Sequence, residues 1–128
     1  MKFPNPIDMC RPSAYTSVVS KQSMQEPTFL ILTALAAGAQ HGYGIMSDVA
    51  RISDGRVRLR AGTLYAALDR LKADGLVTSD KEEVVDGRLR RYYRITDEGT
   101  ELLATEVQRL RANAAVAATR LGLAGGTA

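Results

Sequence analysis

The chain has 128 residues and a formal net charge of +3, with 45% hydrophobic and 24% charged residues. This length suits one compact domain, and this balance excludes collagen-like, mucin-like and wholly disordered chains. The longest apolar stretch, residues 29–37, is too short to cross a membrane, because a spanning helix needs about 20 apolar residues.

Residues 1–26 are predicted to be a flexible N-terminal extension. They hold prolines at positions 4, 6 and 12, a patch rich in Ser and Thr, and no helical spacing of apolar residues. The first residues lack the unbroken apolar core of a secretory signal, and the single cysteine, Cys10, has no partner for an internal disulfide. A cytoplasmic location without a membrane partner is therefore expected.

Two helices are predicted next. The first begins at Pro27, because proline suits a first helical turn, and its apolar stripe is Leu30, Ile31, Ala34, Leu35 and Gly38. Residues 38–42 interrupt the pattern, and His41, the only histidine, is expected to shape this turn. The second helix covers residues 43–52 and is expected to bury Ile45, Val49 and Ile52.

A short strand and a third helix follow. Residues 56–59 alternate arginine with Val57 and Leu59, the pattern of a half-buried strand. The third helix is predicted over residues 62–73, with Gly75 placed to end it. Its inward positions are Leu64, Leu68 and Leu71.

A β-hairpin is predicted after the third helix. One strand begins at Leu76, the turn is Asp86-Gly87, and the second strand returns over residues 89–96. A two-residue turn places Glu83 opposite Arg90 and Glu82 opposite Arg91. These arginines can therefore stabilise the sheet by pairing with the glutamates, bind a ligand, or do both.

The last predicted helix begins after a cap at Thr96 or Asp97 and ends near Leu121. Apolar residues recur along it at intervals of four and three, the seam of paired helices. The alternative is that this helix packs back on its own domain. The seam positions, and hence the predicted dimerisation residues, are Leu103, Val107, Leu110, Ala114, Ala117 and Leu121.

The predicted fold class is mainly α, within the α+β class. A helix-turn-helix followed by a two-stranded wing is the winged-helix arrangement, here with a long C-terminal dimerisation helix. We therefore expect a DNA-binding domain over residues 27–96, a dimerisation helix over residues 97–121 and a disordered tail over residues 122–128.

The third helix is the candidate for contact with DNA bases, because the second helix of a helix-turn-helix enters the major groove. Its outward side is predicted to carry Thr63, Ala66 and Arg70, flanked by Tyr65, Asp69 and Lys72. The residues predicted to read bases are Thr63, Tyr65, Ala66 and Arg70. Positive charge is concentrated nearby: residues 51–94 hold 11 Lys and Arg against 7 Asp and Glu, whereas residues 95–128 hold 3 against 4. The predicted phosphate contacts are Arg60, Lys72, Arg88, Arg90 and Arg91.

The chain resembles the PadR family of bacterial transcriptional regulators. Four motifs in order carry the resemblance: residues 41–45, residues 62–68, residues 74–77, and the wing from Gly87 to Thr96. The resemblance implies a dimeric winged-helix repressor of the subgroup with one dimerisation helix, with DNA contacts at Thr63, Tyr65 and the wing arginines. Three departures stand out: Arg60-Ala61 replaces the usual serine cap, and Ala66 and Leu89 stand where proline is common.

The function predicted from the sequence is a homodimeric repressor that binds a near-palindromic operator in double-stranded DNA. No catalytic set, metal ligand cluster or cofactor motif is present, so an enzyme is not expected. Two alternatives stay open: a winged-helix module that binds protein, and an RNA-binding protein. Some relatives bind flat hydrophobic effectors between aromatic residues, and the lack of tryptophan disfavours such a ligand here without excluding it.

Overall fold

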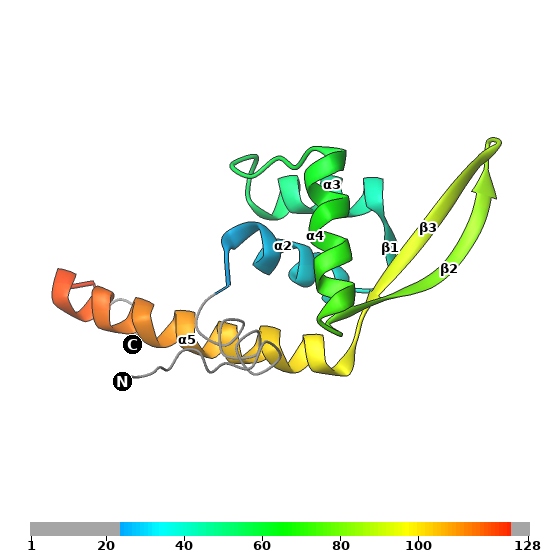
Figure 1. The fold of residues 1–128 in the computed structure, drawn as a ribbon. Coiled ribbons are helices and arrows are strands. Elements are labelled where there is room, and N and C mark those ends of the chain that lie inside the picture. The colour runs from blue at the N-terminus through cyan, green and yellow to red at the C-terminus, as the bar shows by residue number, and fades with distance from the viewer. Residues whose placement is uncertain (1–23, 124–128) are drawn as a thin grey trace, which may run out of the picture.

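The computed structural model describes residues 24–123, so the expectations for residues 1–23 and 124–128 lie outside it. Within that range the chain forms helices, then a hairpin, then one long helix (Figure 1). The elements are α2 Glu26–Ala36, β1 Gln40–His41, α3 Gly42–Ile52, α4 Ala61–Ala73, β2 Val77–Val85, β3 Arg88–Ile95 and α5 Asp97–Leu121. The predicted winged-helix class is confirmed.

The hydrophobic core lies where α2, α3 and α4 meet. Leucines 64, 68 and 71 of α4 are buried as predicted, and Ile45 and Val49 of α3 face them. Full burial of one such side chain contributes about 1.5–3 kcal/mol. On α2 the apolar stripe ends earlier than predicted, because the helix stops at Ala36 and Gly38 is exposed at φ +149°. Leu32, which the stripe omitted, is fully buried, because α2 packs against both α3 and α5.

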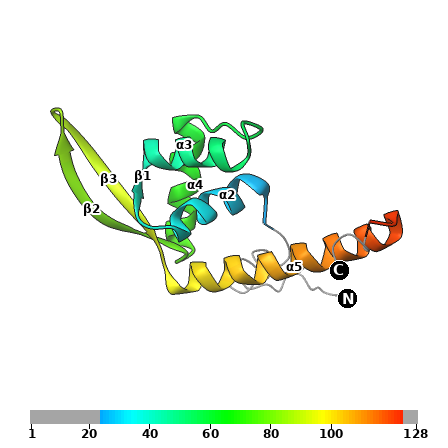
Figure 2. The same cartoon turned by 180° about the vertical axis from the view of Figure 1, so that it is seen from behind.

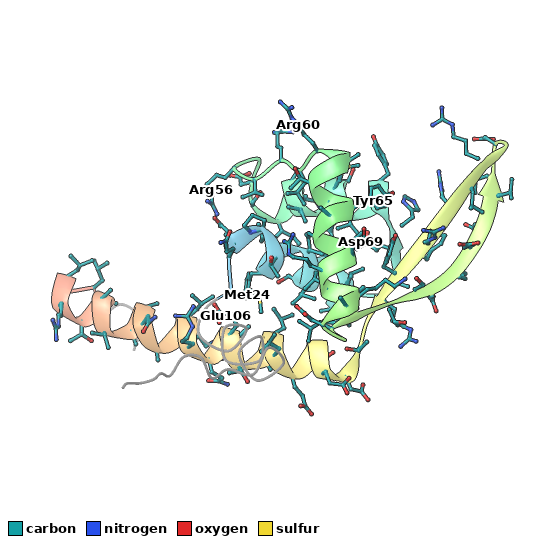
Figure 3. The ribbon with its side chains drawn as sticks, in the orientation of Figure 1. Met24, Arg56, Arg60, Tyr65, Asp69 and Glu106 are labelled. Carbon is teal, nitrogen blue, oxygen red and sulfur yellow. The ribbon has the colours of Figure 1, made fainter. Side chains whose placement is uncertain are left out.

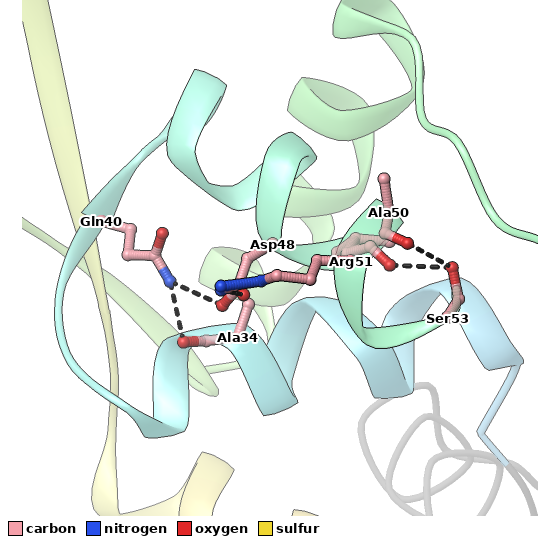
Figure 4. A network of polar contacts seen from close by, with 7 residues as sticks. Ala34, Gln40, Asp48, Ala50, Arg51 and Ser53 are labelled. Atoms are coloured by element: carbon pink, nitrogen blue, oxygen red, sulfur yellow. Dashed lines mark hydrogen bonds and ion pairs between the residues drawn. The ribbon is translucent and has the colours of Figure 1, made fainter. Parts of the chain in front are cut away.

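A polar network connects α2 with α3 (Figure 4). The Gln40 amide donates to the Ala34 carbonyl at 3.0 Å and to the Asp48 carboxylate at 3.1 Å. Asp48 also forms an ion pair with Arg51. The hydrogen bond from Arg51, aided by that from Gln40, holds the pKa of Asp48 below its ordinary value of 3.8, although burial acts in the opposite direction. The network therefore fixes α3, the first helix of the helix-turn-helix, to the end of α2 through a charged group.

Two expectations between residues 52 and 60 are wrong. Ile52 is 42% exposed, because the buried place at the end of α3 is taken by Ser53. Residues 56–59 form no strand. Their arginines do point outward and Val57 packs inward, but the Val57 N–H is satisfied by the Ser53 hydroxyl at 3.0 Å instead of by a neighbouring strand. The third strand of the sheet is β1, from the segment expected to be only a turn.

The sheet has the strand order β1-β3-β2 and is antiparallel throughout. The hairpin turns at Asp86 (φ 53°) and Gly87 (φ 76°), the left-handed pair that a two-residue turn requires. The predicted cross-strand register, Glu83 with Arg90 and Glu82 with Arg91, is confirmed. Nearer the helices, β2 carries the two residues 80 and 81 opposite Tyr92 alone, which makes a bulge in the wing.

α5 is capped by Thr96, whose hydroxyl accepts the Gly99 N–H at 3.0 Å, so of the two predicted caps Thr96 is the one that forms. The helix ends at Gly122, in the left-handed conformation. Figures 1 and 2 show that its first half lies beneath the winged-helix domain and that its second half extends beyond it. The 25 residues of α5 correspond to about 38 Å of helix. No described helix, this one included, has the length and apolar character needed to cross a membrane.

A hydrogen bond connects the residue Met24, just before α2, with α5. The Glu106 carboxylate is buried, pairs with Arg109, and accepts a hydrogen bond from the Met24 backbone (Figure 3). The hydrogen bond from Arg109 is the main cause that lowers the pKa of Glu106 below its ordinary value of 4.5. Met24 packs against the core and Glu26 is helical, so these last residues of the expected extension belong to the described fold.

Candidate nucleic-acid interface

α4 presents three different surfaces around its axis. With 3.6 residues per turn and the leucines inward, Gly62, Ala66 and Asp69 point directly away from the core. Thr63 and Arg70 lie on one flank of α4, and Tyr65 and Lys72 lie on the other. The predicted contact residues are all exposed, but they are distributed over both flanks and do not form one stripe.

The start of α4 is open to a ligand. Arg60 is the N-cap residue and its side chain makes no capping hydrogen bond, as the loss of the usual serine predicts. The first N–H groups of a helix have no partner within the helix and attract anions. Arg60 also carries an exposed guanidinium beside these N–H groups (Figure 3). This end of α4 can therefore bind a phosphate.

Tyr65 has a structural role as well as an exposed edge. Its ring lies against Gly42 at the start of α3 and 6.5 Å from the Tyr93 ring, between ring centroids. The side chain is 43% exposed. Packing thus holds the phenol in one place at the side of α4, from which the hydroxyl can reach a base or a phosphate.

A groove of about 480 Å³ separates α3 and α4 from the wing. It brings Tyr65 of α4 into one surface with Arg88, Arg90 and Arg91 of β3. Tyr43, at the start of α3, also lines it and is 73% exposed. Tyr43 is not among the contact residues predicted from the sequence, although a large aromatic residue between glycines in the first turn of a helix was a usable signal.

The wing arginines differ in how free they are. Arg91 pairs with Glu82 at 3.0 Å, and this hydrogen bond raises its pKa further. Glu83 lies opposite Arg90, but its carboxylate accepts the Tyr92 hydroxyl at 2.6 Å. Within residues 24–123, neither Arg88 nor Arg90 forms an ion pair. Two of the three predicted wing cations are therefore available to an anionic partner.

The other flank of α4 borders a second groove, of about 630 Å³, which we call the α2–α4 groove. Thr63, Ala66 and Arg70 of α4 line it together with Arg60, and Pro27 and Thr28 of α2 face them. Lys72 is on the opposite flank, where its ammonium donates to the Ser79 hydroxyl at 3.0 Å at the base of the wing. The structure thus divides the predicted contact residues between two grooves, except Lys72, which lines neither.

Residues 31–105 match the Transcriptional regulator PadR-like family, a match that covers more than half of the chain. The chain belongs to this family. A transcriptional regulator of Mycobacterium tuberculosis is 41% identical over 76 residues, which are 59% of this chain and 67% of that protein.

Solved structures share the fold of this PadR-like regulator. A PadR family transcription regulator from Clostridium difficile superposes with a TM-score of 0.64 at 28% identity, over 76% of this chain and 99% of that one. Bacillus subtilis PadR in complex with operator DNA has a TM-score of 0.55 at 22% identity, over 62% of this chain and 46% of that one. Family and relatives are transcriptional regulators, not enzymes. The described residues contain no group of three or more side chains suited to a metal ion.

The predicted seam of α5 in this PadR-like regulator divides into two parts. Leu103 is buried in the core of its own domain and Val107 is half-buried. From Leu110 onward the seam is exposed, at 41% for Leu110 and 72% for Leu121, with Ala114 and Ala117 between them. Val116, which lies outside the predicted seam, is 54% exposed. The first half of α5 therefore packs on its own domain, and the seam positions of the second half are exposed in the single chain.

Proposed function

We propose that this DNA-binding regulator is a homodimeric repressor that acts in the cytoplasm on a near-palindromic operator. The observation that carries the proposal is the groove beside the wing, where Tyr65 of α4 and the unpaired Arg88 and Arg90 of β3 border one space. A helix in the major groove and a cationic ribbon along the adjacent strand would then act together.

The proposed division of contacts follows side-chain chemistry and exposure. Thr63 can donate to or accept from a base edge, Ala66 can contact a thymine methyl, and Arg70 can reach a base. Tyr65 would add its hydroxyl from the wing side. Phosphate contacts are proposed for Arg60, Lys72, Arg88, Arg90 and Arg91. Because Arg91 and Lys72 already have protein partners, they would contribute less than Arg88 and Arg90.

The proposed dimer is formed through the second half of α5. Leu110, Ala114, Ala117 and Leu121 lie at the spacing of a helix seam and are exposed in the single chain. A helix is stabilised mostly by packing of its apolar face, which here needs a second copy. Two-fold symmetry would present two α4 helices to half-sites about 34–36 Å apart, or a multiple of that distance.

A salt titration on a duplex selected from a random pool tests this function. A dimer that neutralises about six phosphates should show a slope near −5 in a plot of log affinity against log salt. We expect Arg88→Ala to reduce that slope for every duplex alike, whereas Thr63→Ala should narrow the gap between selected and random DNA. Arg111→Ala, on α5, is the control for the loss of one charge. A flat salt response, or no preference among duplexes, would refute the proposal.

A further inference from the structure

The two grooves beside α4 match the two walls of a DNA major groove. A helix with its side chains is about 10–12 Å across and the major groove is about 12 Å wide. A helix inserted there has one sugar-phosphate strand along each of its flanks. On one flank of α4 a DNA strand would lie in the groove beside the wing. The other DNA strand would then lie against the α2–α4 groove on the opposite flank.

The α2–α4 groove has the charge and shape that such a strand requires. Arg60 and Arg70 stand on its rim, and neither forms an ion pair within the described range. They are ten residues apart, about 15 Å along the helix axis, so they can contact different phosphates. The groove also has an apolar lining, which suits the carbons of deoxyribose. The apolar lining residues are Pro27, Ile31, Leu59, Ala66 and Ala67.

The first turn of α2 forms the opposite rim. Thr28 lines the groove and offers a hydroxyl together with a backbone N–H of a first helical turn. Gln25, the N-cap residue of α2, makes no side-chain cap, so these N–H groups remain without a side-chain acceptor. The nearby acid, Glu26, is paired with Arg56 at 2.8 Å, which offsets its repulsion of an anion.

We propose that the first turn of α2 belongs to the DNA-binding surface and that the α2–α4 groove holds one sugar-phosphate strand, contacted by Thr28 and Arg70. The wing and Arg88 hold the opposite strand of the same half-site. This inference rests on the proposed function. It adds a contact residue, Thr28, moves Arg70 from a base edge to a phosphate, and assigns the cations to strands.

A charge inserted at Thr28 tests the groove. Glutamate is favourable in the first turn of a helix, so Thr28→Glu should fold normally. Thr100→Glu in the first turns of α5 is the matched control, because Thr100 is exposed and lines neither groove. By fluorescence anisotropy on the selected duplex we expect about a fivefold loss of affinity for Thr28→Glu, the repulsion of two charges about 4 Å apart in water. Thr100→Glu should bind as the unaltered protein does.

Single methylphosphonate substitutions in one half-site test the strand assignment, because each removes the charge of one phosphate. The binding of Arg70→Ala and of Arg88→Ala should each be insensitive to particular methylphosphonates that weaken DNA binding by the unaltered protein. We expect these phosphates to lie on opposite strands. If Arg70→Ala and Arg88→Ala lose sensitivity to phosphates of the same strand, the inference is overturned while the DNA-binding function stands. The same holds if Thr28→Glu binds as tightly as the unaltered protein. Failure of the unaltered protein to bind any duplex would overturn both.

Discussion

The contact between Gly42 and Tyr65 leads to a quantitative prediction. A Cβ atom added at Gly42 would lie 2.7 Å from Cζ of Tyr65, and closer still to its hydroxyl, whereas ordinary van der Waals contact begins at 3.4 Å. The phenol ring must retreat by at least the difference. The ring packs against the buried Tyr93 but is 43% exposed, so it can shift partly toward solvent, and Gly42→Ala should cost about 1 kcal/mol, the lower end of the range for overpacking.

A double-mutant cycle can isolate this contact. Thermal unfolding at one protein concentration should show Gly42→Ala melting about 4–8 °C lower for each kcal/mol lost. In a Tyr65→Ala background the same substitution should be neutral, because the ring that it meets is gone. Gly62→Ala is the control, since a Cβ there meets nothing within 4 Å. Equal destabilisation by Gly42→Ala in both backgrounds would refute the argument.

The other predictions concern the dimer, acid stability and the wing. Leu110→Glu should convert the proposed dimer to monomers in sedimentation, whereas Gln108→Glu should not, because position 108 lies off the seam; a dimer unchanged by Leu110→Glu would place the interface elsewhere. The pKa of Glu106 is lowered on folding, so its ion pair stabilises the fold above about pH 4.5 and that contribution is lost as the pH falls below this value. Glu106→Gln should therefore cost about 1–2 kcal/mol in urea unfolding at pH 7, discounted for the exposure of Arg109, and a cost that persists at pH 3 would contradict this origin. Gly87→Ala should weaken DNA binding and broaden the amide signals of the wing in NMR spectra, because φ 76° strains any residue with a Cβ; an unchanged spectrum would count against a turn set by this glycine.

The features that the sequence predicted correctly depend on neighbours within the chain. The inward leucines of α4, the Asp86-Gly87 turn with its register, and the cap at Thr96 each follow from spacing or from the chemistry of adjacent residues. Such features form wherever the segment lies, because helical period and turn geometry are local properties of the backbone. The resemblance to the PadR family rested on these same local motifs.

Contacts between distant segments had to be read from the tertiary structure. Residues 56–59 have the alternation of a strand, yet β1 at Gln40–His41 is the segment that lies beside β3. The Glu83 carboxylate could accept a hydrogen bond from Arg90 or from Tyr92. In the folded chain it accepts the Tyr92 hydroxyl, so Arg90 has no ion pair within the described residues. The division of α5 into a packed half and an exposed half has the same origin.

The amino-acid sequence by itself therefore determined the helices and the hairpin of this protein, their order and the identity of its cationic wing, but not the third strand. Only the tertiary structure decided which side of each element is covered, and with it the α2–α4 groove that joins Thr28 to Arg70 across 41 intervening positions of the chain. The physical reason is that pairing and burial depend on which surfaces meet, and surfaces that meet are chosen by the packing of the whole core.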